Sequence, residues 1–226
     1  LLFSHSGSID TDGNGPDFMP HVANLTRNVV IRSENPAGIR GHVMFTARAD
    51  IDIRYVEFRD LGRTLAYPLD STKLDSEGNV THIGTNQIGR YALHNHHLVG
   101  PFKPITGPSA ILPINTDNGE AVETKTNKYQ VIEIGNSIWN TTPNEKKWGL
   151  TIHNTHFGLF KNNVVYNVAG ASIVTEDGSE TYNVIENNLV AGMEGSKLLM
   201  DDNPLDYGHQ GDGFWFGGPH NFVRNN

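Results

Sequence analysis

A small set of histidine and carboxylate side chains recurs in short segments that otherwise read as β-strands. The residues that carry these groups are His94, His96, His153, Glu176, Asp177 and Arg90. Imidazoles with a carboxylate suit a divalent cation, Zn²⁺, Mn²⁺ or Ca²⁺, and such a cation would polarise a substrate oxygen or lower the pKa of a bound water. Without a metal the same groups can donate or remove protons, while an arginine pairs with an acidic or hydroxylated substrate. The sequence therefore raises two chemical hypotheses, a metal centre and a metal-free acid–base site.

Alignment of three segments predicts that these side chains share one outer face. The segments 90–96, 149–155 and 170–176 align without gaps. Because side chains alternate between the two faces of a strand, the polar positions point outward, and Tyr91 and Ala171 are among the apolar positions expected to point inward. The expected outer columns are His94 with His153, and His96 with Thr155 and Glu176. The predicted metal ligands are His94, His96, His153 and Glu176.

Internal repeats predict the fold that positions these strands. Asparagines recur in similar segments at intervals of 27, 25 and 38 residues, and an insertion over 194–210 accounts for the longest interval. The aligned asparagines are Asn136, Asn163, Asn188 and Asn226. A period near 25 fits one coil of an all-β, right-handed, single-stranded parallel β-helix, in which stacked coils bury a common core and the asparagines form a ladder. The alternative is a β-sandwich with unrelated Asn-rich loops.

The chain reads as one partial solenoid domain over residues 1–226. It starts without Met and stops within a repeat, so we expect a fragment of a longer protein. Residues 62–85 and 101–126 break the strand pattern and are predicted to form long excursions from the solenoid, which often wall a binding groove.

Composition excludes several classes of function. The 17 basic and 25 acidic residues give a net charge of −8, so nucleic acid is not an expected partner. No run of about 20 apolar residues is present, which predicts no membrane span in this sequence. The absence of cysteine excludes disulfides and thiolate metal sites, while the oligomeric state stays open.

Two further features suggest ligand contacts. Residues 10–15 begin like a calcium loop, but His21 stands where a bidentate Glu is required, which favours a polar turn. Trp215 alternates with Phe214 and Phe216, so we expect it to face outward and to stack on a sugar ring as a substrate-binding residue.

At the same positions the sequence resembles a known family, the hyaluronan-depolymerising cell-surface proteins and their bacterial relatives. The matching segments are Arg90–His96, Thr151–Thr155, Glu176–Gly178, Asn24–Ile31, Gly41–Phe45 and Lys161–Tyr166. At Ala92 and Asn95 the sequence departs from the proline and the aromatic residue of the animal members. The resemblance implies a glycine-rich β domain followed by parallel β-helix repeats, an extracellular or cell-surface location and a polysaccharide substrate, with His94, His96, His153, Glu176 and Asp177 as the positions carried over.

These observations favour an extracellular polysaccharide-active protein, a hydrolase or a lyase, that acts at an outer groove containing the histidines and Glu176. The alternative is a non-catalytic solenoid that serves as a spacer, an adhesin or a glycan-binding module. An enzyme requires the imidazoles and Glu176 within a few ångströms of one another, whereas a spacer tolerates them scattered.

Overall fold

The chain folds into three parallel β-sheets of five strands each. The computed structural model describes residues 11–13, 20–47, 49–65, 70–98, 129–142, 146–195, 208 and 210–226. The first sheet runs, in spatial order, β1 (Val29–Arg32), β4 (Val56–Arg59), β9 (Ser137–Trp139), β12 (Val164–Tyr166) and β15 (Leu189–Ala191). The second runs β16 (Phe214–Trp215), β13 (Ile173–Thr175), β10 (Leu150–His153), β7 (Leu93–His96) and β2 (Val43–Thr46). The third runs β17 (Phe222–Arg224), β14 (Val184–Glu186), β11 (Gly158–Lys161), β8 (Val131–Ile134) and β3 (Ile51–Arg54).

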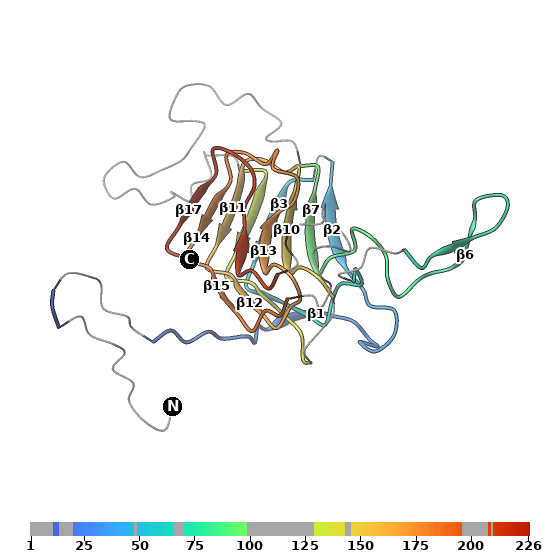
Figure 1. The fold of residues 1–226 in the computed structure, drawn as a ribbon, viewed down its shortest axis with the longest axis horizontal. Helices are drawn as coiled ribbons and strands as arrows, with labels where there is room; N and C mark the ends of the chain where they lie inside the picture. Colours follow the sequence, from blue (N-terminus) through green and yellow to red (C-terminus); the bar gives the residue numbers. More distant parts are fainter. Residues whose placement is uncertain are drawn as a thin grey trace.

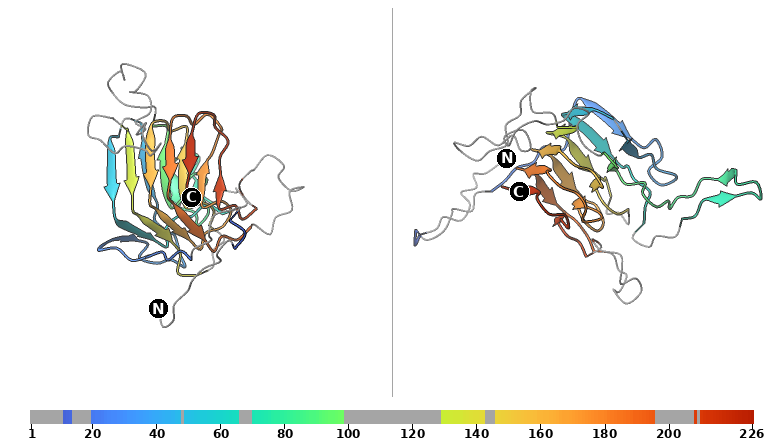
Figure 2. Two further views of the ribbon diagram at one scale, coloured as in Figure 1. Left: turned by 90° about the vertical axis from the view of Figure 1, so that its left-hand side faces the viewer. Right: turned by 90° about the horizontal axis from the view of Figure 1, so that it is seen from above.

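Successive strands visit the three sheets in turn, so each coil contributes one strand to every sheet (Figure 1). Each strand pairs in parallel with its counterpart in the neighbouring coil, and the strands of a sheet lie side by side in both views of Figure 2. This is the topology of a parallel β-helix. The predicted fold class is therefore confirmed, and the β-sandwich alternative is wrong.

The core lies inside the coils and is built from apolar rows. In the second sheet Leu93, Leu150 and Ile173 are in register and have no solvent exposure. A coil of three short strands cannot bury its inner side chains alone, so stacking of the coils supplies the hydrophobic burial that stabilises the fold. The outer faces are consequently free to carry polar side chains.

The predicted asparagine ladder is present at the turn between the third sheet and the first. The backbone N–H groups of Asn136, Asn163 and Asn188 donate to the side-chain oxygen of the ladder residue in the next coil, at 3.0, 2.9 and 2.9 Å. The side-chain amide of Asn163 also donates to the carbonyl of Glu133 at 2.9 Å. Residues Asn162 and Asn187, just before the ladder, have φ angles of 56° and 53°, which Asn adopts more readily than most residues. Asparagine therefore satisfies both the conformation and the hydrogen bonding of this turn.

Residues 70–85 leave the solenoid. They include an antiparallel pair, β5 (Lys73–Leu74) and β6 (Val80–His82), which projects away from the three sheets in Figure 1. The base of this excursion is fixed by the Thr64 hydroxyl, which donates to the carbonyl of Gln87 at 2.6 Å. The other predicted excursion, over 101–126, lies outside the described residues. No helix among the described residues has the length and apolar character that crossing a membrane requires.

Candidate functional site

The second sheet brings the predicted histidines together on its outer face. Pairing of β7 with β10 puts His96 opposite His153, and pairing of β10 with β13 ends at Ile152 and Thr175, so Glu176 follows in the same row. The predicted column of His96 with Glu176 is therefore right, whereas the segment of His153 is displaced by two residues, because His94 pairs with Thr151 and not with His153. Since strand side chains repeat with period two, this shift leaves the same side chains on the same face.

Two other predicted orientations are wrong. Thr155 lies outside the outer column, where it is fully buried and its hydroxyl donates to the carbonyl of His153 at 3.0 Å. Tyr91 packs on the outer side together with Ala171 and does not enter the coil interior. Alternation holds only within a regular strand, and β7 begins at Leu93, so it does not extend back to Tyr91.

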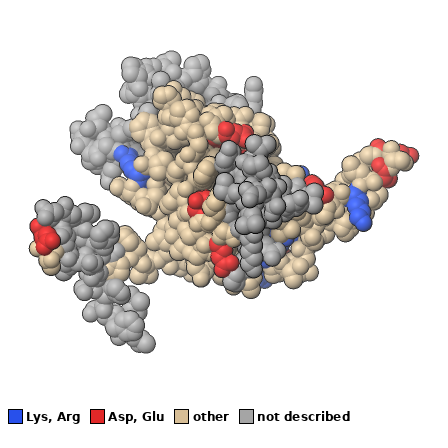
Figure 3. All heavy atoms as spheres, viewed as in Figure 1, with Lys and Arg blue, Asp and Glu red and all other residues tan. Residues whose placement is uncertain are grey.

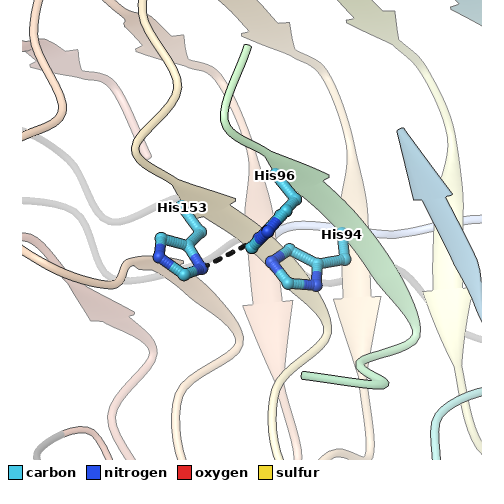
Figure 4. A group of neighbouring side chains, drawn as sticks. All are labelled: His94, His96 and His153. Atoms are coloured by element: carbon cyan, nitrogen blue, oxygen red, sulfur yellow. Dashed lines mark hydrogen bonds between the residues drawn. The ribbon is translucent and has the colours of Figure 1, made fainter. Parts of the chain in front are cut away.

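The imidazole rings of the site converge on a small volume. Figure 4 shows the rings of His94, His96 and His153 directed toward one another, and one ligand atom from each lies within 4.8 Å of the others. The Nδ1 atoms of His96 and His153 are 3.1 Å apart. Glu176 Oε2 lies 3.1 Å from His153 Nδ1 and 3.9 Å from His94 Nε2. Three nitrogen atoms and one oxygen atom, contributed by three successive coils, thus face one point.

Neighbouring groups determine the tautomer of His94 and the orientation of His153 and Glu176. The Nδ1 of His94 lies 2.8 Å from the carbonyl of Gly89, which only accepts, so Nδ1 carries the proton and Nε2 presents its lone pair to the cluster. Asp177 Oδ2 lies 2.8 Å from Nε2 of His153 and orients that ring. The Tyr91 hydroxyl donates to Glu176 Oε1 at 2.9 Å. When His153 is neutral, these contacts leave His94 Nε2 and His153 Nδ1 unprotonated and facing the centre.

Burial and charge act differently on the pKa values of the cluster. Burial lowers the pKa of His94 to about 4, and burial followed by the neighbouring His153 lowers that of His96. For His153 burial acts to lower the pKa, but the hydrogen bond and charge of Glu176, then the charge of Asp177, outweigh it and raise the pKa. Burial would raise the pKa of Glu176, yet contacts with His153 lower it. The arrangement therefore favours an ionised Glu176 beside one proton-accepting imidazole.

The residues present fit a transition-metal ion. His94 Nε2 and Glu176 Oε2 are both buried and have no hydrogen bond of good geometry among the described residues, although Glu176 Oε2 lies 3.1 Å from His153 Nδ1. Ligand atoms around a tetrahedral zinc ion are about 3.3 Å apart, close to the two separations of 3.1 Å measured from His153 Nδ1. Metal-bound histidines usually donate their other ring N–H to a carboxylate or a carbonyl, as Asp177 and Gly89 would accept here. The alternative occupant is a proton on His153 Nδ1, which would face Glu176.

Arg90 and Trp215 flank the cluster. Arg90 is half-buried, and its charge contributes to lowering the pKa values of His96 and His42. Trp215 pairs with Val174 in the outer row that also contains Thr151, and it packs against the apolar cluster of Tyr91 and Trp148. Both side chains thus lie on the face that carries the histidines.

Some residues at the site were not predicted from the sequence. The carbonyl of Gly89 and the hydroxyl of Tyr91 were missed because neither follows the strand alternation. Glu180 follows no repeat in the sequence, and in the structure it is fully buried and accepts hydrogen bonds from three backbone N–H groups. His97 lies beside the cluster, with its ring centroid 4.2 Å from that of His96. The run of three histidines at 94, 96 and 97 was the available signal for it.

Comparison with known proteins identifies the family. A family model described as CEMIP beta-helix matches residues 69–226, more than two thirds of the chain. Fibrocystin-L of Mus musculus and Fibrocystin-L of Homo sapiens are each 34% identical over 77 residues, which is 34% of this chain and 2% of the length of those relatives. No solved structure matches the chain. The family resemblance noted in the sequence is confirmed, and the chain belongs to the CEMIP β-helix family.

Proposed function

We propose that this chain is a polysaccharide-active β-helix, extracellular or at a cell surface, whose reaction centre is the outer cluster of His94, His96, His153 and Glu176. The observation that supports it is a pair of buried atoms aimed into the cluster, His94 Nε2 and Glu176 Oε2, which have no hydrogen bond of good geometry among the described residues; Glu176 Oε2 faces His153 Nδ1 at 3.1 Å. Leaving a polar atom buried without a partner costs about 1–3 kcal/mol. A fold that keeps two such atoms together retains them for a ligand or a reaction.

A divalent transition metal is the occupant that this set of atoms suits best. His94 Nε2, His96 Nδ1 and His153 Nδ1 would hold it, with Glu176 Oε2 as the fourth ligand. When bound, the metal would supply Lewis-acid polarisation of a sugar oxygen or a lowered pKa of water. Asp177 keeps the His153 ring oriented through Nε2, and Tyr91 keeps the second oxygen of Glu176 occupied.

The same geometry supports proton transfer without a metal. A proton on His153 Nδ1 would be held between Glu176 and the neighbouring His96, and Glu176 and Asp177 favour that protonated state because they raise the pKa of His153. His153 would then serve as the general acid toward a glycosidic oxygen, and Asp177 or Glu176 as the base. Hydrolysis and elimination both use an acid and a base, so both bond-breaking reactions fit this centre.

Substrate contacts extend from the cluster on the same face. Arg90 would pair with an acidic or hydroxyl group of a sugar at the start of β7. Trp215 would stack on the apolar face of a sugar ring next to β13. On the face drawn in Figure 3 the described Lys and Arg side chains lie apart from one another, which favours recognition by individual contacts over attraction to a basic surface.

The decisive experiment combines elemental analysis with a depolymerisation screen on neutral and acidic polysaccharides. We expect His153→Ala to lose bound metal and to lower activity at least 100-fold, because His153 touches both His96 and Glu176. The matched control is His220→Ala, which removes an exposed imidazole stacked on Tyr182 at a ring distance of 5.8 Å.

The outcomes separate the alternatives. Metal and activity lost together in His153→Ala, and kept in His220→Ala, support the metal centre. Activity without bound metal that is lost in His153→Ala supports the acid–base version. A wild-type protein that binds a glycan but cleaves none favours the non-catalytic solenoid, and an active His153→Ala protein overturns the proposed centre.

A further inference from the structure

We propose that Glu180 is a positioning residue that locks two turns together and thereby sets the geometry of His153, Glu176 and Asp177. The importance of this geometry for catalysis rests on the proposed function, whereas the lock itself does not. Glu180 touches no ring of the cluster in any contact described above. Its carboxylate acts on the backbone that carries the cluster.

The carboxylate of Glu180 accepts hydrogen bonds from three backbone N–H groups. Oε1 accepts from Asn154 at 2.8 Å and from Asp177 at 3.1 Å, and Oε2 accepts from Gly178 at 2.9 Å. Asn154 directly follows His153 at the end of β10, while Asp177 and Gly178 directly follow Glu176 after β13. One side chain thus ties together the ends of two neighbouring strands.

The chemistry of the site explains why a carboxylate stands there. Glu180 has no solvent exposure, and a buried carboxylate needs several donors to offset its desolvation. The three N–H groups lie in turns where no sheet partner is available, since β10 ends at His153 and β13 at Thr175. A charged acceptor makes stronger hydrogen bonds than a neutral one, so each turn is held more firmly than by a backbone carbonyl.

The next coil in turn holds Glu180. The side-chain amide of Asn221 donates to the carbonyl of Glu180 at 2.8 Å. A Cβ atom at Gly218 would collide with the same carbonyl oxygen, so only glycine permits this close approach. Gly178 has a φ angle of 80°, a conformation that glycine adopts without strain. The loop before β17 therefore holds the backbone of Glu180 in place, and the Glu180 carboxylate in turn holds the backbone of the site.

The consequence for the site is geometric. The 2.8 Å contact between His153 Nε2 and Asp177 Oδ2 joins a residue on β10 to a residue on the turn after β13. Glu180 bonds the backbone of Asp177 itself and of the residue next to His153, so it fixes both ends of that contact. Without Glu180 the turn of Asp177 and Gly178 loses its two side-chain acceptors, and Asp177 no longer holds one tautomer of His153.

Glu186 provides a matched control. It is also a buried carboxylate in the same coil, 1% exposed. Its partners, however, are the partly buried cations of Lys161 and Arg224 on the third sheet, each at 2.8 Å. Its loss should lower stability without moving the second sheet. A comparison of variants at the two positions separates positioning of the site from general support of the fold.

The test uses the full 226-residue chain with Glu180→Ala, Glu180→Gln and Glu186→Gln. The first readout is the ¹⁵N NMR signature of the His153 ring in metal-free protein, at a pH where the imidazole is neutral. The second readout is the affinity for Zn²⁺ in competition with a chelator. Circular dichroism and urea unfolding establish that each variant is folded under the conditions of the measurement.

We expect the wild type and Glu186→Gln to show His153 protonated at Nε2. Glu180→Ala should show a mixture of tautomers and bind zinc about 10- to 100-fold more weakly. Glu180→Gln keeps one acceptor oxygen, so its loss should be smaller. A changed tautomer in Glu180→Ala with no zinc binding by any variant, wild type included, supports the lock and contradicts the metal centre. A folded Glu180→Ala with the wild-type tautomer overturns the proposal, as does an equal change in Glu186→Gln.

Discussion

Two stacked rows of polar side chains on this solenoid differ in how many of their hydrogen-bonding atoms have a partner. In the asparagine ladder, Asn163 Oδ1 accepts from Asn136 while its amide donates to Asn188 and to the carbonyl of Glu133. In the histidine cluster, His94 Nε2 and Glu176 Oε2 have no such hydrogen bonds within the part of the chain that the structure describes.

The chemistry of the side chains explains this difference. An amide carries a donor and an acceptor, so stacked amides complement one another at the coil spacing of about 4.8 Å. A neutral imidazole has one N–H, and here Gly89 and Asp177 direct it away from the centre for His94 and His153. The rings then present lone pairs to one another, and only a proton or a cation completes the arrangement. Stacked amides therefore stabilise the fold through hydrogen bonds to one another, whereas clustered imidazoles leave lone pairs that can bind a proton or a cation.

The largest effect in this comparison is expected from breaking the ladder. Asn163→Ala removes three hydrogen bonds in a fully buried turn and leaves the N–H of Asn136 and the carbonyl of Glu133 without those partners. At about 1–3 kcal/mol for each unsatisfied buried group, we expect the free energy of unfolding to fall by about 3–5 kcal/mol. Urea unfolding measures the loss.

The internal control for Asn163→Ala is zinc affinity, measured on the same folded variant under conditions of low denaturant. We expect it to stay within about twofold of wild type, because the ladder lies at a different corner of the coil from the second sheet. A loss of stability below about 1 kcal/mol would show that the ladder is not the structural row it is taken to be.

An effect of comparable size, but dependent on pH, is expected from an acid inside the solenoid. Glu133 is fully buried on β8, and burial raises its pKa to about 8, although the hydrogen bond from Asn95 at 3.1 Å acts in the opposite direction. Since the folded pKa exceeds the ordinary value of 4.5, folding takes up a proton between these values. The stability of the wild type should therefore fall as pH rises from about 4.5 to about 8, and level off above that range.

Glu133→Gln tests this expectation. The variant should lose the pH slope and exceed the stability of the wild type near pH 8, by about 1.4 kcal/mol for each pKa unit of the shift removed. Its amide can also donate to Asn95 Oδ1, which has no hydrogen bond to any described residue in the wild type. Urea unfolding near pH 5 and near pH 8 provides the measurement. A difference between variant and wild type that does not change with pH would contradict an ionisable Glu133.

The sequence predicted the fold, the face of the site and the shared column of His96 and Glu176, but not the register of the segment that carries His153. Asparagine spacing identified the coils because the ladder constrains one residue type at one turn. The gapless alignment of the segments predicts that His153 pairs with His94, whereas the actual register follows the core row of Leu93, Leu150 and Ile173. Core packing determines register, and a local motif does not.

The missed residues share a physical cause. Tyr91 precedes β7, so alternation could not indicate its direction, and its hydroxyl reaches Glu176 from outside the strand. Glu180 binds backbone N–H groups, which turns of any sequence carry, so no side-chain pattern indicated these contacts. Patterns of side chains predict which residues share a face, while contacts with backbone atoms of turns require coordinates.

A moderate effect is expected from Tyr91→Phe, which removes one donor to Glu176 without removing a cluster residue. The hydroxyl hydrogen bond of 2.9 Å is made to an ionised, largely buried carboxylate. We expect a stability loss of about 1–2 kcal/mol and zinc binding weakened about tenfold, because Glu176 becomes free to turn from the centre. Unfolding and zinc titration measure the two effects. Unchanged zinc affinity would show that Tyr91 supports packing alone.

The smallest effect on the metal-free protein is expected from His96→Ala. His96 is half-buried, and its Nδ1 faces Nδ1 of His153 at 3.1 Å. Removing it should change metal-free stability by less than about 0.5 kcal/mol, in contrast to several kcal/mol for a ladder asparagine. With zinc at about 100 times its dissociation constant, wild type should gain about 2.7 kcal/mol and the variant much less, while His220→Ala keeps the gain. A large destabilisation of metal-free His96→Ala would mean that the histidines are stacked for structure like the asparagines, and the distinction between the two rows would fail.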